Sequence, residues 1–252
     1  GTAYCSLQDA LTVWISGDEI WVAAGNYTPV PVGSYNSLSV ERQTAFNIPS
    51  GVVLYGGFNG TETDRGQRNV TTNITILSGD ISGNGWDQTD NEEDSFHVVV
   101  AANGSTVDGF LIRGGNSNGG GLFNYGGGIY ISDATVAVDN CRFEHNYAAY
   151  GGGIYVAGAS TSIISDCVFY TNGASISGGA AHTHSGATPT YQRCEFLSNT
   201  ATSNGGAMYM SNDGTKPVIV NCAFIGNTTN QSGAAIYSTE GFDLMNCSFS
   251  GN

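Results

Sequence analysis

Residues 141–146, Cys-Arg-Phe-Glu-His-Asn, open the part of the chain that decides the fold. They follow a pattern of cysteine, any residue, phenylalanine, two residues and asparagine. Five copies occur, at Cys141/Phe143/Asn146, Cys167/Phe169/Asn172, Cys194/Phe196/Asn199, Cys222/Phe224/Asn227 and Cys247/Phe249/Asn252. Successive cysteines stand 26, 27, 28 and 25 residues apart. A motif that returns at such an interval indicates a repeat protein.

A second motif lies between these copies and consists of three small residues, an apolar residue and an aromatic ring. It reads Gly-Gly-Gly-Ile-Tyr at 126–130 and 151–155, Gly-Gly-Ala-Ala-His at 178–182, Gly-Gly-Ala-Met-Tyr at 205–209 and Gly-Ala-Ala-Ile-Tyr at 233–237. Consecutive glycines disfavour a helix, so the repeat is not helical.

The spacing of the apolar residues predicts short strands that meet at corners. Cysteine and phenylalanine are two residues apart, as neighbours on one face of a strand are. A large apolar residue stands three positions before each cysteine, at Val138, Ile164, Tyr191, Ile219 and Leu244. This odd spacing requires a bend if both are to face inward. The bend falls at residues that mostly favour turns, Asn140, Asp166, Arg193, Asn221 and Asn246.

These patterns predict an all-β fold, a right-handed parallel β-helix (solenoid) with a short N-terminal capping helix. A single coil cannot bury its own apolar face, so coils stack and share one core. At about 25 residues per coil, the chain would form roughly nine or ten coils. Residues 1–125 hold the cap and irregular coils with inserted loops, and residues 126–252 hold five regular coils of 25–28 residues.

The first half of the chain is less regular. Residues 7–14 form an amphipathic pattern, which predicts a capping helix or, alternatively, a partner-binding helix. Further strands are expected at residues 19–24, 50–55, 74–77, 96–100 and 107–112. Phe110 and Ile112 take the places later held by cysteine and phenylalanine. Insertions are expected to protrude at residues 60–69 and 80–95, gathered on one face as in other solenoids.

Three columns of side chains follow from stacking equivalent positions. Cys141, Cys167, Cys194, Cys222 and Cys247 are expected to line the core beside the phenylalanines, with disulfides between neighbouring coils as the alternative. The motif asparagines are expected to hydrogen-bond along the axis. Cys5 stands apart. The third column should face outward with accessible rings, for sugars or a neighbouring molecule, and comprises Tyr130, Tyr155, His182, Tyr209 and Tyr237. The alternative is that these rings stack on one another or are covered by loops of the same chain.

Charge and composition restrict the partners. The net charge is −14, with only seven Lys and Arg, which argues against nucleic acid and anionic membranes. No apolar stretch approaches the roughly 18 residues of a membrane span. The chain begins at Gly1 without Met and ends at the close of a repeat without a divergent cap. We therefore expect a leader that was removed or omitted, and a last coil that meets more of its own chain or another molecule.

No cofactor is required by the sequence, although calcium is possible. Candidate calcium ligands stand in the acidic insertion, at Asp80, Asp87, Asp90 and Asp94, but without the spacing of a known calcium loop. A solvated acidic loop is the alternative. His182 and His184 alternate along a strand and are a weaker metal candidate. Glycosylation sequons begin at Asn26, Asn59, Asn69, Asn73, Asn103, Asn227, Asn230 and Asn246; Asn246 is the weakest because it sits in a corner.

The glycine motif and Phe-x-x-Asn resemble the repeats of chlamydial polymorphic membrane proteins. The opening, Leu-Gln-Asp-Ala-Leu at 7–11 and Gly-Asp-Glu-Ile-Trp-Val at 17–22, is similar to the N-terminal cap of pectin-lyase-like surface proteins. The resemblance implies an extracellular or cell-surface structural role, as an adhesin stalk or a filament subunit that assembles head to tail. The partner would be another copy, a continuation of the chain, or carbohydrate. This chain departs from the family in carrying a cysteine in all five regular coils.

Enzymes that cleave polysaccharides share this fold, which makes a polysaccharide-binding or polysaccharide-cleaving protein the alternative. Glycosidases of the inverting type need carboxylates roughly 6.5–9.5 Å apart. The cations of the regular coils, Arg142, Arg193 and Lys216, are dispersed. The acidic residues of the regular coils do not form an in-register cluster. They are Asp133, Asp139, Glu144, Asp166, Glu195, Asp213, Glu240 and Asp243. We therefore assign no catalytic residue and predict a non-enzymatic protein.

Overall fold

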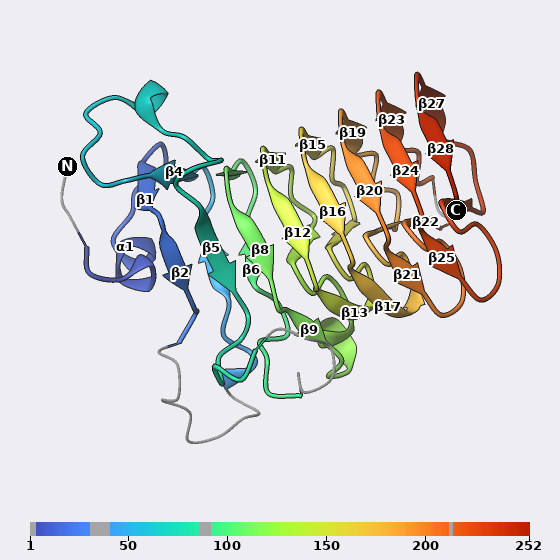
Figure 1. Cartoon of the computed structure of the whole chain (residues 1–252), viewed down its shortest axis with the longest axis horizontal. Helices are drawn as coiled ribbons and strands as arrows, with labels where there is room; N and C mark the ends of the chain where they lie inside the picture. The colour runs from blue at the N-terminus through green and yellow to red at the C-terminus, as the bar shows by residue number, and fades with distance from the viewer. Residues whose placement is uncertain (1–3, 31–40, 86–91, 212–213) are drawn as a thin grey trace.

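The computed structural model describes residues 4–30, 41–85, 92–211 and 214–252. It is a right-handed parallel β-solenoid whose coils follow one another from the N-terminal end to the C-terminal end, and this confirms the predicted fold class (Figure 1). The two longest sheets hold eight strands each in the described residues, fewer than the nine or ten coils expected. The difference arises because the long insertions of the first half use chain that adds no coil.

Four parallel sheets form the walls. Sheet A contains β1 (Glu19–Ala23), β4 (Val53–Phe58), β7 (Thr106–Asp108), β11 (Ala137–Asp139), β15 (Ile163–Ser165), β19 (Thr190–Gln192), β23 (Val218–Val220) and β27 (Asp243–Met245). Sheet B contains β2 (Gly25–Tyr27), β5 (Thr75–Ser78), β8 (Leu111–Arg113), β12 (Arg142–Glu144), β16 (Val168–Tyr170), β20 (Glu195–Leu197), β24 (Ala223–Ile225) and β28 (Ser248–Ser250).

Sheet C contains β3 (Phe46–Ile48), β6 (Val99–Ala101), β10 (Ile129–Ser132), β14 (Ile154–Ala157), β18 (Ala181–His184), β22 (Met208–Met210) and β26 (Ile236–Ser238). Sheet D contains β9 (Asn116–Ser117), β13 (Tyr147–Tyr150), β17 (Gly173–Ser177), β21 (Thr200–Ala201) and β25 (Thr228–Thr229). A regular coil runs through C, A, B and D. The helices are α1 (Leu7–Thr12) and the 3-10 turns η1 (Arg65–Gln67) and η2 (Gly121–Asn124).

The corners explain how an odd spacing can keep both residues inside. Every residue before a motif cysteine has a left-handed φ between 49° and 55°, which turns the chain from sheet A into sheet B. Gly126 begins the glycine motif at the corner between sheets D and C with a φ of 64°. A Cβ on Gly128 would stand 2.4 Å from the carbonyl oxygen of Gly153, so no side chain fits there.

The corner between sheets C and A varies most in length. The residues between the sheet C and sheet A strands are 133–136, 158–162, 185–189, 211–217 (of which 212–213 lie outside the described residues) and 239–242, so this connection differs in length. The path from the motif cysteine to the motif asparagine has the same length in every copy. Within the regular coils, variation in length is therefore confined away from the A–B corner.

The motif asparagines form a hydrogen-bonded ladder inside the wall. The Nδ2 of Asn199 donates to the carbonyl oxygen of Phe169 (2.9 Å) and to Oδ1 of Asn227 (3.0 Å). Its Oδ1 accepts from the backbone N–H (3.0 Å) and Nδ2 (3.1 Å) of Asn172. Equivalent bonds continue to Asn252. Each buried amide is thus satisfied, and each coil is held in register with the next.

The core beside this ladder is a stack of phenylalanine rings. Phe143, Phe169, Phe196 and Phe224 are fully buried and nearly parallel, with neighbouring centroids 4.5–4.9 Å apart. The inward residues of sheet C pack on the same core. Side chains of successive coils therefore fill one continuous interior.

The first half departs from several expectations. The helix ends at Thr12, two residues early, and β2 and β3 were not predicted. The strand expected at 107–112 is two strands, because Gly109 has a φ of 86° and forms the A–B corner. Ile112 does pair with Phe143 in register, as predicted.

The insertions leave the solenoid at different places. Residues 60–69 lie over sheet A, while the described part of residues 80–95 follows β5 of sheet B (Figure 1). The expectation that both gather on one face is therefore wrong. The first insertion stands at the A–B corner between β4 and β5, and the second stands between β5 of sheet B and β6 of sheet C.

Candidate functional site

The predicted aromatic column lies on the outer face of sheet C. Its members occupy one register position in five adjacent strands, Tyr130, Tyr155, His182, Tyr209 and Tyr237. The Tyr130 and Tyr155 rings are 5.6 Å apart and inclined by 6°, and the Tyr209 and Tyr237 rings are 5.3 Å apart and inclined by 12°. The rings therefore stack on one another, and their faces are largely used within the column.

The middle of the column is not accessible, which corrects the sequence prediction. Tyr155 is only 6% exposed and His182 only 3%. Tyr125 lies 4.6 Å from Tyr155, and the Tyr150 ring packs edge-on against His182 at 5.2 Å. These two tyrosines stand directly before the glycine motif. Later coils carry smaller residues at that position, and Tyr209 and Tyr237 remain half-buried.

Burial also fixes the ionisation of the column. It raises the pKa of Tyr155 far above its ordinary value, with smaller contributions from Tyr125 and Tyr130. Burial lowers the pKa of His182 to about 3, although the backbone of Ser177 opposes this. The middle of the column is therefore neutral at ordinary pH.

A hollow of about 500 Å³ opens where the column meets α1. Leu11 and Trp14 border it from the helix segment, and residues of three sheet C strands and of the turns that follow two of them border it from the wall. Its lining is Leu11, Trp14, Asn47, Ile48, Pro49, Val100, Ala101, Ala102, Tyr130 and Ser132. Sequence reasoning missed this site because its walls come from segments separated by more than a hundred residues.

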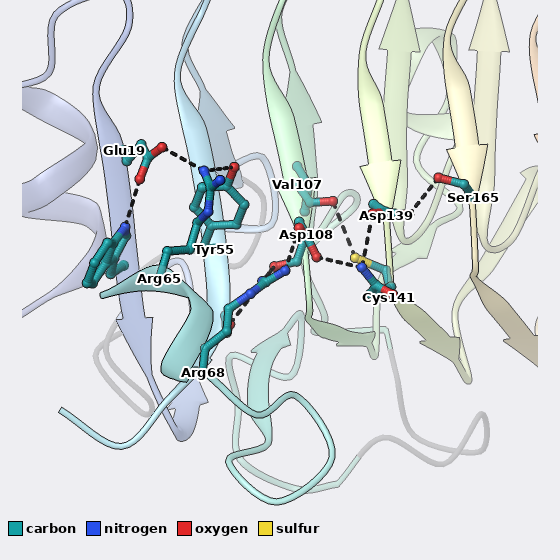
Figure 2. A network of polar contacts seen from close by, with 12 residues as sticks. Glu19, Tyr55, Arg65, Arg68, Val107, Asp108, Asp139, Cys141 and Ser165 are labelled. Carbon is teal, nitrogen blue, oxygen red and sulfur yellow. Dashed lines mark hydrogen bonds and ion pairs between the residues drawn. The ribbon is translucent and has the colours of Figure 1, made fainter. Parts of the chain in front are cut away.

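A polar network on the outside of sheet A fastens the insertion at residues 60–69 (Figure 2). Arg65 Nη1 donates to Glu19 (2.8 Å) and to the Tyr55 hydroxyl (2.8 Å). Arg68 Nη2 is 2.6 Å from Asp108 Oδ2, and both side chains are largely buried. The two arginines therefore hold this loop against the coil walls.

The same network contains an in-register pair of carboxylates that sequence reasoning missed. Asp108 and Asp139 are strand partners, and the Asn140 amide donates to both, at 3.1 and 3.0 Å. Ser165 Oγ donates to Asp139 at 2.6 Å. The pair was missed because Asp108 lies in the irregular half. The oxygens of these two carboxylates already accept hydrogen bonds from Arg68, Asn140 and Ser165. This arrangement holds neighbouring coils together and is structural.

The remaining charged candidates lie elsewhere on the surface. Arg193 pairs with Asp166 (2.5 Å), Arg142 with Glu144, and Lys216 with Asp243 (3.6 Å). Glu195 and Glu240 are exposed, as is Asp133, while Asp213 lies outside the described residues. Each described cation of the regular coils thus pairs with an acid of its own or a neighbouring coil.

The calcium candidates fall into two groups. Asp80 caps its own turn, with Oδ1 accepting from the Gly83 N–H (2.7 Å) and Oδ2 from the Gly85 N–H (3.2 Å). Asp94 is buried, and Asp87 and Asp90 lie outside the described residues. Across the described ranges no three His, Cys, Asp or Glu residues are grouped so that they could hold a metal ion. This includes His182 and His184, whose rings are 6.0 Å apart.

All six cysteines are free thiols in the structure. Cys141, Cys167, Cys194 and Cys222 are buried in the core, Cys247 is half-buried and Cys5 is exposed. Burial raises the pKa of the Cys167 thiol well above its ordinary value. The buried cysteines therefore act as small apolar residues in the packing.

One glycosylation candidate is incompatible with the fold. Asn26, Asn59, Asn69, Asn103, Asn230 and Asn246 are exposed, and Asn73 is half-buried. Asn227 has no exposed surface, and its Nδ2 donates to Phe196 O (2.9 Å) and to Asn252 Oδ1 (2.7 Å). A glycan on this nitrogen would remove a donor and has no room.

We therefore expect a clear difference between the adjacent sequons at Asn227 and Asn230. Folded protein secreted from a glycosylating host should carry no glycan at Asn227, while the exposed Asn230 is free to carry one. Peptide mass spectrometry measures both sites in one sample. Asn230→Gln should remove that mass and leave folding unchanged. A glycan found on Asn227 in folded protein would contradict the ladder.

Comparison with known proteins identifies the family. The model for the right-handed beta helix region matches residues 96–252, which is more than half of the chain. The chain therefore belongs to the right-handed β-helix family. The finer resemblance to chlamydial proteins stays a prediction. None of the curated proteins matches.

Among solved structures, the chain is similar to a pectin methylesterase from Yersinia enterocolitica. The two share 11% sequence identity over 99% of this chain and 91% of that one, with a TM-score of 0.47. This likeness concerns the course of the chain and carries no argument about chemistry. Among the described residues, no helix has the length and apolar character needed to cross a membrane.

Proposed function

We propose that the protein is a non-enzymatic structural β-helix of an extracellular surface, serving as an adhesin stalk or filament subunit. The carrying observation is the unbroken asparagine ladder, with side-chain bonds of 2.7–3.1 Å between all five regular coils. Together with the phenylalanine stack, it fixes each coil to the next. Such a rigid rod would hold a domain at its end at a fixed distance from the surface to which the rod is attached, as a stalk does.

A filament requires each molecule to bind another copy of itself. In the last described coil, Leu244 is 42% and Phe249 47% exposed, although they are in register with the buried Ile219 and Phe224. A further coil would cover them. That coil would come from a continuation of the chain or, in the head-to-tail hypothesis, from a second copy, and because head-to-tail contacts do not close, they propagate.

Electron microscopy and antibody labelling test this proposal. Antibodies should label intact cells of the source organism, and purified protein at high concentration should form rods longer than one molecule. Leu244→Asp should shorten these rods because it places a charge on the stacking edge, while Ile163→Asp, a matched exposed site on sheet A, should not. Label found only after permeabilisation would exclude a surface role. Single short particles at every concentration would exclude self-assembly.

A further inference from the structure

The motif cysteines are not used by the proposed structural role, although every regular coil carries one. Packing alone does not require sulfur at this position, because Phe110 holds it in the preceding coil, one residue before the paired Leu111 and Arg142. We call these five residues the cysteine column. They are Cys141, Cys167, Cys194 and Cys222, which are buried, and Cys247, which is half-buried.

Every sulfur of the cysteine column has the same orientation. The Cys141 thiol donates to the carbonyl oxygen of Val107 at 3.5 Å (Figure 2), and the Cys194 thiol donates to that of Ile164 at 3.4 Å. The other three thiols make the equivalent bond to the coil before their own, at 3.5–3.7 Å. Each cysteine also stands directly before an in-register strand of sheet B. Neighbouring sulfurs therefore repeat at the coil spacing of about 4.8 Å.

This spacing suits a metal ion between two sulfurs better than it suits a disulfide. A disulfide needs sulfurs about 2.0 Å apart and Cβ atoms about 3.5–4.5 Å apart. Two metal–sulfur bonds of about 2.3 Å, placed in a line, span about 4.6 Å. Thiolate sulfur selects soft cations, and Hg²⁺ among them takes two sulfurs in a line. Because only two ligands are needed, such a site differs from the groups of three that the described ranges lack.

The charge of the core favours a divalent ion. Burial raises the pKa of the Cys167 thiol, and its neighbours Cys141 and Cys194 add to the shift, so this thiol is protonated at ordinary pH. Two buried thiolates without a counter-ion would be costly. A divalent cation M²⁺ and two thiols give M(S-Cys)₂ and two released protons, with no change of oxidation state. The product is neutral, whereas a monovalent cation between two thiolates would leave one negative charge in the core.

We propose that the cysteine column binds soft divalent cations that coordinate two sulfurs in a line, one cation for each pair of neighbouring cysteines. Each sulfur belongs to one pair, so five cysteines hold two cations and one thiol is left over. Zn²⁺ takes four ligands in a tetrahedron and does not fit. The site goes beyond the structural role, because it lets the rod bind thiophilic metal ions in its interior.

Counting bound metal tests the proposal. All proteins carry Cys5→Ser, which removes the exposed thiol. Each protein is refolded in the presence of HgCl₂, so that the ions reach the buried sulfurs. It is then passed over a gel-filtration column in dilute glutathione, which removes ions held by a single sulfur. Elemental analysis should find two mercury ions per molecule, and the same procedure with ZnCl₂ should leave no zinc.

The order of the cysteines supplies matched variants. Cys194→Ala leaves one neighbouring pair on each side and should still bind two ions. Cys167→Ala isolates Cys141 and leaves a run of three cysteines, so it should bind one ion. Both variants lose one buried cysteine, so an unspecific reaction of thiols would give equal counts. If either variant fails to fold, Cys247→Ala, with two ions expected, and Cys222→Ala, with one ion expected, repeat the comparison.

Proton release gives an independent readout of the same site. Titration of folded protein at constant pH should record two protons for each mercury ion bound, because both thiols of a pair lose theirs. Circular dichroism checks that each variant is folded. Three results would each overturn the proposal: the parent retains no mercury, Cys167→Ala and Cys194→Ala retain equal amounts, or each bound ion releases a single proton.

Discussion

Replacing Phe196 by alanine should lower the free energy of unfolding by about 3–5 kcal/mol. Phe196 has no exposed surface, and its ring lies between Phe169 (4.9 Å) and Phe224 (4.7 Å), both inclined by only 5°. The substitution removes apolar contacts on both ring faces and leaves a cavity in a wall that the asparagine ladder keeps from collapsing. Denaturant unfolding followed by circular dichroism measures the loss.

Phe249 supplies the matched control for this prediction. It occupies the same repeat position, but it is 47% exposed and stacks on one side only, on Phe224 at 5.0 Å. Phe249→Ala should therefore cost clearly less than Phe196→Ala. Equal losses would show that position in the stack does not matter, and the account of the core as one continuous packing unit would then be wrong.

Acid should destabilise the protein through His182. Its pKa is about 3 in the folded state and about 6.5 in the unfolded chain, because burial disfavours the charged ring. Protons therefore bind the unfolded chain more tightly. The stabilising contribution is complete above pH 6.5 and is lost as the pH falls toward 3. At about 1.36 kcal/mol per pH unit, the loss reaches about 3 kcal/mol at pH 4 and about 4 kcal/mol at pH 3.

His182→Tyr separates this effect from other titrating groups. Tyrosine occupies the same position in the coils on either side, at Tyr155 and Tyr209, so the ring should fit the column. Carboxylates and the buried His97, whose pKa is also lowered by burial, remain in both proteins. The variant should lose less stability between pH 7.5 and pH 4 than the parent, measured by thermal unfolding. Identical pH profiles would exclude His182 as the acid-sensitive group.

The repeat motifs were sufficient to predict the regular coils. Each copy carries both the residue that turns the corner and the residues that fill the core, so local sequence and packing agree. The column was predicted to face outward with accessible rings, and cover by the same chain was only the alternative, without the residues that provide it. The signal was present: a tyrosine precedes the glycine motif at Tyr125 and Tyr150, where later coils have Ser177 or Asn204.

The sites between distant segments could not be predicted in the same way. Asp108 pairs in register with Asp139 only because Gly109 forms a corner that the sequence suggested was mid-strand. The hollow needs the position of α1 against sheet C, which depends on how the first coils stack. Neither feature follows from a spacing within one repeat.

The variable corner between sheets C and A has a practical consequence for engineering. Natural coils accept four residues at 133–136 and seven at 211–217 without moving the columns on either side. A foreign peptide inserted there would extend from the rod while the ladder below it stays in register. Inserts in successive coils would stand about 4.8 Å apart along the axis. The protein could thus serve as a scaffold on which antigens or enzyme-recruiting peptides are placed at intervals of one coil.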